Sequence, residues 1–133
     1  MGKGRTTEND YIAFVFNATA MPSYGSNLFV HLHTADPGVT GTSSTNEVAY
    51  TGYAAVQVAR DGTGWTPSGS GTVTNFANVT FPQCGGGSST ATYASVCSTG
   101  GQILYYGSLT APLNISNLII PQFPAGTLIM TEA

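Results

Sequence analysis

Charged residues are scarce in this 133-residue chain. Lysine and arginine together number three and acidic residues six, so charged residues make up 7% of the chain and the net charge is −3. Ordinary soluble domains carry roughly 25% charged residues. The basic residues Lys3, Arg5 and Arg60 are too few to neutralise a run of phosphates, so we expect no direct contact with nucleic acid. A surface so poor in charge is typical of a protein covered by other protein.

Long apolar runs and a cysteine framework are also missing, and both absences bear on the compartment. No stretch approaches the about 20 apolar residues that a membrane-spanning helix needs, and no signal peptide opens the chain. We therefore expect synthesis in a cytoplasm and no membrane contact. Two cysteines, Cys84 and Cys97, are too few for a disulfide framework. A reducing compartment favours free thiols, but the sequence leaves their pairing open.

The sequence lacks the usual catalytic and phosphate-binding motifs. It has no nucleophile elbow of the G-x-S-x-G type, and the glycine run at residues 85–87 is not followed by a lysine. His31 and His33 lie on one face of a predicted strand and could supply two metal ligands. However, Asp36 falls beyond the strand end, and no third ligand is indicated. We therefore predict no catalytic, metal-binding or cofactor-binding residue, with a zinc site at the two histidines as the weaker alternative.

A single helix is expected near the start of the chain. Thr7 resembles an N-terminal cap, and Glu8 and Asp10 follow it near the positive end of the helix dipole. The pattern ends at Pro22. Residues at i, i+3, i+4 and i+7 give this helix one apolar face: Tyr11, Phe14, Val15 and Ala18.

From Asn27 onward the apolar period changes to two, which indicates strands. Gly, Pro, Ser and Asn separate the runs, as in antiparallel proteins with short turns. We predict an all-β fold, a single antiparallel β-sandwich or jelly roll with a short N-terminal helix. Residues 1–26 form an arm and helix, and residues 27–133 form the β-sandwich domain. The expected strands are Leu28–Thr34, Tyr53–Arg60, Gly64–Thr66, Val73–Phe81, Ala91–Cys97, Gln102–Ser108, Ile115–Ile119 and Gly126–Thr131.

Aromatic residues offer a further binding chemistry. Tyr105 and Tyr106 are adjacent in a predicted strand and must face opposite ways, so at least one is exposed or at an interface. An isolated exposed tyrosine is normal in any protein. A sugar-binding platform is the alternative interpretation for the aromatic side chains of the β-domain: Tyr50, Tyr53, Trp65, Tyr93, Tyr105 and Tyr106.

Five sequence elements resemble a family of small structural proteins from tailed-phage and prophage virions, and the resemblance extends over nearly the whole chain. The elements are HLHTADPG at residues 31–38, TNEVAYTGYA at 45–54, GW at 64–65, TFPQC at 80–84 and LTAPLNISNLIIPQFPAGTL at 109–128. The chain departs from the family pattern at Ala55, where arginine is usual, and at Leu118, where glycine is usual. Both departures could alter a contact with a partner without endangering the fold.

The resemblance implies a non-enzymatic virion protein and leaves two roles open. Members are often described as tail-fibre-like, while small β-sandwich proteins also serve as cement on phage capsids. The sequence shows no repetitive stalk, so we favour a capsid cement or decoration protein that bridges major capsid protein subunits at the capsid surface. The alternative is a small tail-fibre-like or head-to-tail component, with contact to host glycans as one form of that role. Either would assemble in the bacterial cytoplasm.

The expected contacts are with the major capsid protein and with other copies of the chain, as a dimer or trimer at lattice axes. We also expect residues 1–7 to reach a neighbouring subunit as an arm, in which Lys3 and Arg5 meet acidic groups. The candidate partner-contacting residues are Lys3, Arg5, Tyr11, His31, His33, Tyr105 and Tyr106.

Overall fold

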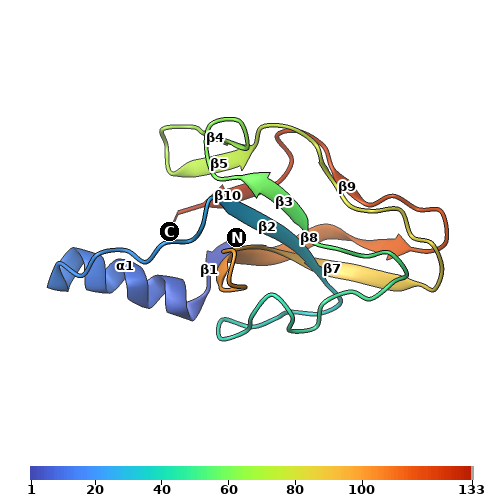
Figure 1. Cartoon of the computed structure of the whole chain (residues 1–133), viewed down its shortest axis with the longest axis horizontal. Coiled ribbons are helices and arrows are strands. Elements are labelled where there is room, and N and C mark those ends of the chain that lie inside the picture. Colours follow the sequence, from blue (N-terminus) through green and yellow to red (C-terminus); the bar gives the residue numbers. More distant parts are fainter. Residues whose placement is uncertain (133) are drawn as a thin grey trace.

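The chain folds around a five-stranded antiparallel sheet (Figure 1). The computed structural model describes residues 1–132, so Ala133, the last residue of the predicted β-domain, lies outside the described residues. The elements in chain order are β1 (Gly2–Lys3), α1 (Arg5–Asn17), β2 (Asn27–His33), β3 (Val56–Ala59), β4 (Trp65–Pro67), β5 (Thr72–Asn75), β6 (Val79–Thr80), β7 (Ser89–Cys97), β8 (Ile103–Ile115), β9 (Gln122–Phe123) and β10 (Ile129–Thr131).

The five-stranded sheet has the order β1-β8-β7-β2-β3 and two distinct faces. Val30 pairs with Val96, and Leu32 pairs with Ala94, so the alternating apolar residues of β2 and β7 meet on one face. All four side chains are almost completely buried. The residues between them, including His31 and Ser95, point to the opposite face, because side chains in a strand alternate.

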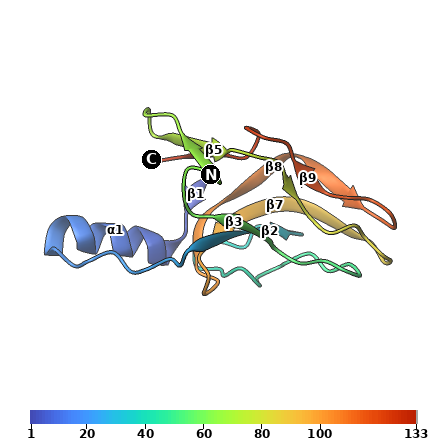
Figure 2. The ribbon, with the colours of Figure 1, turned by 45° about the horizontal axis from the view of Figure 1, so that its top comes forward.

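A second layer covers the apolar face of this sheet. It consists of a three-stranded sheet of order β10-β5-β4 and the β6-β9 pair, and Figure 2 shows these strands above the main sheet. Phe81 sits in the core between Tyr53 and Phe123, each with a ring centroid 6.2 Å from its own. The prediction of an all-β antiparallel fold with a short N-terminal helix is therefore confirmed.

The predicted strand Val73–Phe81 is wrong as one element, because it divides into β5 and β6. Asn75 ends β5 with its side chain buried, and its amide nitrogen donates to the carbonyl oxygens of Ala77 (2.8 Å) and Pro124 (3.0 Å). Its side-chain oxygen accepts from the backbone N–H of Leu128 at 2.9 Å. This bonding turns the chain, and Phe76 points outward at 60% exposure.

The other predicted strand boundaries fail mainly near β8. The strand predicted at Ile115–Ile119 does not form, since Ile115 is the last residue of β8 and a turn follows it. β8 continues past the predicted end at Ser108 and includes Pro112. The sheet tolerates this proline because β8 pairs with β7 on one side, while on the other side β1 pairs with residues 105–106 and not with the part of β8 that holds Pro112. The two-residue strands β1 and β9 were not predicted.

The helix begins three residues earlier than its sequence pattern suggests. Gly4, not Thr7, is the N-cap. A side chain at Gly4 would place Cβ 2.4 Å from the carbonyl oxygen of Ile103, so glycine lets the helix base approach β8 closely. Thr7 lies inside the helix, and its hydroxyl donates to that same carbonyl oxygen at 2.9 Å. The helix ends at Asn17, well before Pro22, through left-handed Ala18. Among residues 1–132, no helix combines the length and apolar character needed to cross a membrane.

Candidate functional site

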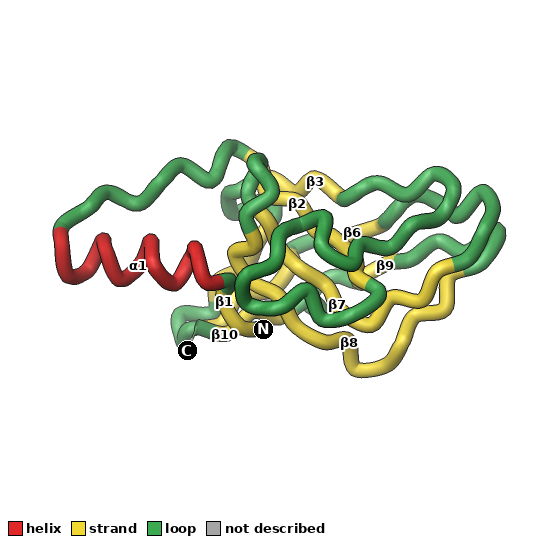
Figure 3. The backbone as a smooth tube through the Cα atoms, turned by 90° about the horizontal axis from the view of Figure 1, so that it is seen from below, coloured by secondary structure: helices red, strands yellow, loops and turns green. Residues whose placement is uncertain are grey.

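The outer half of α1 presents a concentrated apolar surface. The helix projects from the sheets, and the chain returns beside it (Figure 3). Phe16 is 79% exposed, and four neighbouring large apolar residues are about half exposed. Ile12 follows Tyr11 by one position, and Phe16 follows Val15 by one position. Each step turns about 100° around the helix, so the apolar surface is wider than the predicted single face. We define the arm surface as Tyr11, Ile12, Phe14, Val15 and Phe16.

The inner half of the helix is fixed by polar contacts, which leaves the arm surface beyond them. The carboxylate of Asp10 accepts hydrogen bonds from the Gln102 side-chain amide at 3.0 Å and from the Tyr24 hydroxyl at 3.2 Å. Burial and the neighbouring charge of Asp10 raise the pKa of Tyr24 to about 12. Arg5 pairs with Glu8 one turn along at 3.1 Å. The charges of the helix are thus engaged near its base.

Lys3, Tyr11 and Tyr105 meet at one end of the sheet. The Lys3 ammonium pairs with Glu132 and lies 4.7 Å from the centre of the Tyr11 ring, and the Tyr105 hydroxyl donates to the same carboxylate. These bonds, above all the one from Lys3, lower the pKa of Glu132. We predicted that residues 1–7 reach a neighbouring subunit. This prediction is wrong for residues 2–3, because they pair with Tyr105 and Tyr106 of their own chain.

His31 belongs to a partly buried network on the outer face of the main sheet. Its Nδ1 lies 2.5 Å from Glu47 Oε2, and the Tyr53 hydroxyl donates to the same oxygen at 2.7 Å. The Tyr53 oxygen also accepts the backbone N–H of Leu32 at 3.1 Å. Burial, followed by the bond to Glu47, raises the pKa of Tyr53 beyond its usual range. The network ties the loop after β2 to the sheet.

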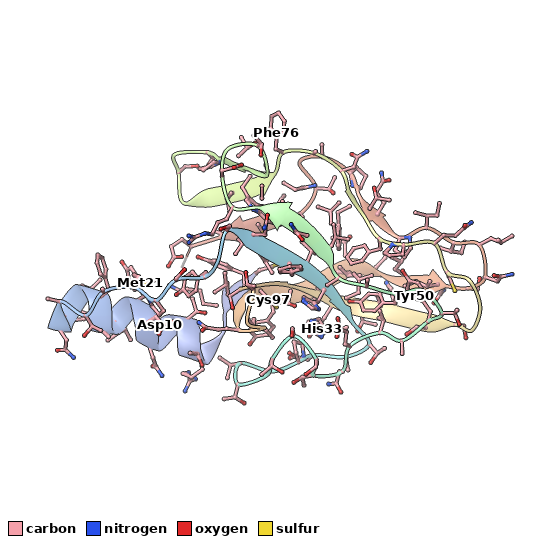
Figure 4. The ribbon with its side chains drawn as sticks, viewed as in Figure 1. Asp10, Met21, His33, Tyr50, Phe76 and Cys97 are labelled. Carbon is pink, nitrogen blue, oxygen red and sulfur yellow. The ribbon has the colours of Figure 1, made fainter. Side chains whose placement is uncertain are left out.

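His33 is completely buried at the end of β2, beneath the same loop (Figure 4). Because a carbonyl oxygen can only accept, its Nδ1–H donates to Thr45 O at 2.7 Å, and its Nε2 accepts from the Ser95 hydroxyl at 2.7 Å. Ser95 Oγ lies 3.3 Å from Cys97 Sγ. Burial lowers the pKa of His33, so the ring is neutral at pH 7. The prediction that His33 contacts a partner is therefore wrong for this fold.

The Ser95–His33 pair has the separation of a nucleophile and its base, but it has no access for a substrate. Both side chains are fully buried, and the ring is oriented by a backbone carbonyl. Burial also raises the pKa of Cys97 to about 11, so this thiol stays protonated and inert. Cys84 and Cys97 are free and buried. Within residues 1–132, no cluster of three or more His, Cys, Asp or Glu side chains could hold a metal ion.

The aromatic residues do not form one exposed platform. Tyr50 and Trp65 are buried in the core, and Tyr53 packs against it. Tyr105 and Tyr106 face opposite sides of the sheet as predicted, and both are half-buried. The sugar-platform interpretation therefore fails for Tyr50 and Trp65, because their ring surfaces stabilise the domain.

A second apolar surface lies at the loop between β8 and β9. Leu118 is 68% exposed and has left-handed backbone geometry with φ of 73°, a conformation that suits the glycine usual in the resembling family. Its N–H donates to Cys84 O at 2.8 Å, and Cys84 N–H donates to Ile119 O at 2.8 Å. This backbone clasp holds the exposed residues Leu118, Ile119 and Ile120 outward.

Sequence reasoning placed Tyr11, Phe14 and Val15 on the apolar face of the helix but missed Ile12 and Phe16. Ile12 and Phe16 do not fit the i, i+3, i+4 pattern and were therefore overlooked. The available signal was composition, since residues 11–16 contain five large apolar side chains and no charge. A helix that is apolar around much of its circumference is normally covered by protein.

Comparison with known proteins gives one family. The family described as podophage GP4 fiber I protein gp80 matches residues 3–131, nearly the whole chain and all the elements described above. No curated protein matches the chain. The match spans both the helical arm and the sheets, so the chain belongs to the podophage GP4 fiber I protein gp80 family of small phage virion structural proteins.

Proposed function

We propose that the protein is a non-enzymatic structural subunit of a podophage virion and that it is incorporated at the tail as a component of a fibre. The family match over residues 3–131 carries this proposal. The arm surface supports it, because an exposed apolar surface without charged side chains is suited to contact with other protein. The buried Ser95–His33 pair supports a structural role as well, since it stabilises the domain where a substrate cannot enter.

Capsid cement is the second candidate, and one observation favours it. The arm surface and the Leu118–Ile120 loop lie at opposite ends of the molecule (Figure 1). A subunit with an apolar contact at each end could bridge two neighbouring major capsid protein subunits on the capsid surface. Repeated over a lattice, such bridges would stabilise the assembled shell by mass action.

The copy number and position of the protein in the virion separate the two roles. Purified virions would be disrupted and separated into heads and tails, and the protein would be quantified against the major capsid protein by mass spectrometry. The fibre proposal expects a small fixed number of copies that travels with the tail fraction. A number comparable with that of the major capsid protein, found on heads, would contradict the fibre proposal and favour cement.

A further inference from the structure

An apolar groove runs along the free side of β8. There β1 pairs with Tyr105 and Tyr106 and Met1 lies beside Gly107, so within residues 1–132 no strand pairs with the rest of β8 on that side. The groove has a volume of about 620 Å³, and it is lined by residues 1–2 and by residues of β8, β9, β10 and the segment between the last two strands. Its large apolar side chains are Met1, Leu109, Leu113, Phe123, Leu128 and Ile129.

The groove and the arm surface match in chemistry. The residues that line the groove include no charged side chain, and residues 11–21 contain none either. Placing the helix in the groove would therefore bury no charged side chain. A second cavity, of about 480 Å³ at the base of α1, is lined by Arg5 and by the polar side chains of Thr40, Thr42 and Ser43 and does not suit the same helix.

The arm surface is short enough to enter the groove. It occupies residues 11–16 of α1, which extend about 9 Å at 1.5 Å per residue. The β8 side of the groove, from Tyr106 to Leu113, extends about 23 Å at roughly 3.3 Å per residue. The outer half of the helix can thus lie in the groove while the inner half stays bound to its own sheet.

Helix and groove cannot meet within one chain. Gly4 N–H donates to Leu104 O at 3.3 Å and Thr7 to Ile103 O at 2.9 Å, which fixes the helix base to β8. From there α1 points away from the sheets, whereas the groove follows β8 in the other direction (Figures 1 and 3). Met21, labelled in Figure 4, lies on the segment that returns beside the helix.

We propose that the arm surface of one copy binds in the β8 groove of a second copy. The contact is head-to-tail, because each copy offers its helix to one neighbour and its groove to another, so assembly yields a closed ring or a filament. This inference goes beyond the proposed function and concerns purified protein. It therefore stands or falls independently of whether the virion carries the protein on its tail or its head.

The exposed area of the arm surface sets the expected strength. Five large side chains at the observed exposures offer roughly 500–600 Å² if a full side chain presents about 200 Å². Stable complexes bury about 800 Å² per partner, so a single helix–groove junction is weak. A copy that makes both junctions in a closed ring gains from the second at high effective concentration.

The test uses exposed residues, so that the variants keep the fold. Phe16→Asp places a charge on the arm surface, and Ile129→Asp places one in the groove, where Ile129 is 50% exposed. Phe76→Asp and Ile120→Asp are the matched controls, because these residues are similarly exposed and belong to neither surface. Molar mass would be followed against protein concentration by sedimentation, with circular dichroism to verify folding.

We expect the wild-type protein and both controls to assemble, while Phe16→Asp and Ile129→Asp each weaken association on the order of a hundredfold. Mixing the two variants should produce a heterodimer and nothing larger, since the intact helix of Ile129→Asp fits the intact groove of Phe16→Asp. A wild-type protein that stays monomeric at every concentration would overturn the proposal and would indicate that the helix binds a different virion protein. Continued assembly of Ile129→Asp would also overturn it, in favour of contact between helices.

Discussion

The arm surface and the buried pair of His33 and Ser95 reverse the usual placement of polar and apolar groups. His33 and Ser95 are polar and have no exposed surface, while Phe16 is apolar and 79% exposed. The buried pair is complete within the chain, because each atom of the His33 ring that can form a hydrogen bond has a partner. The side chains of the arm surface are about half exposed or more, although the Lys3 ammonium lies over the Tyr11 ring. The comparison teaches that contacts within the β-domain stabilise the fold, whereas the arm surface serves contact with other protein.

The largest predicted contrast compares two phenylalanines. Phe81 is 1% exposed and packs between two aromatic rings, so Phe81→Ala should lower the free energy of unfolding by about 3–5 kcal/mol. Phe16→Ala should change it by no more than about 0.5 kcal/mol. Urea unfolding of dilute, monomeric protein would measure both. A loss above about 1 kcal/mol for Phe16→Ala would mean that the arm belongs to the stable core.

A matched pair of serines sharpens the polar side of the comparison. Ser95→Ala leaves His33 Nε2 without its donor and Cys97 without its neighbour, which should cost about 1–3 kcal/mol in the free energy of unfolding. Ser70 is exposed and bonds within its own turn, so Ser70→Ala should cost less than about 0.5 kcal/mol. Equal effects in urea unfolding would show that the buried chain of hydrogen bonds is not stabilising.

The pH dependence of stability should change when His33 is replaced. Burial lowers the pKa of His33 in the folded state, so below its unfolded pKa of about 6.5 the unfolded chain binds more protons. The contribution of neutral His33 to the free energy of unfolding is fully present above pH 6.5 and is lost as the pH falls toward the folded pKa. In His33→Asn this component should be missing. Unfolding from pH 8 to pH 5 would measure both slopes, and parallel slopes would contradict the assignment.

The smallest predicted effect concerns the contacts of Glu132 with Lys3 and Tyr105. Glu132→Gln removes the charge that holds Lys3 and Tyr105. Glu132 is nearly half exposed, so solvent screening limits the expected loss to less than about 1 kcal/mol. Because the folded pKa of Glu132 is lowered, that contribution is present above the unfolded carboxyl pKa and fades as the pH falls through the folded pKa. If the free energies of unfolding of the wild-type protein and Glu132→Gln differ by the same amount at every pH, these contacts of Glu132 do not contribute as described.

Local pattern predicted the strands that alternate clearly and failed where tertiary contacts decide. β2 and β7 place Val30, Leu32, Ala94 and Val96 at alternate positions in the core, and both strands form close to the predicted ranges. β1 is only Gly2–Lys3, which carries no pattern and becomes a strand through pairing with β8. The division after Asn75 depends on backbone groups some 50 residues away, which no short window contains.

The candidate site was predictable to a similar degree. Period two correctly placed His31 and His33 on one face of β2, but it could not show that Ser95 and Thr45 enclose His33. Tyr11 was chosen from the helical period, whereas the full arm surface needed the three-dimensional fact that these side chains stay about half exposed or more in the folded chain. The β8 groove also depends on the position of β10 and of the segment before it, and its residues are separated by up to 128 positions from Met1 to Ile129.

Hydroxyl-radical footprinting of the arm in virions tests the central claim most directly. Labelling of Phe14, Phe16 and Met21, all exposed in the single chain, would be compared between dilute monomer and intact virions, with buried Phe81 as the reference for full protection. The account predicts strong labelling in the monomer and near-complete protection in the virion. Equal labelling of these three residues in both samples would contradict it, because the apolar arm would then face solvent in the assembled particle.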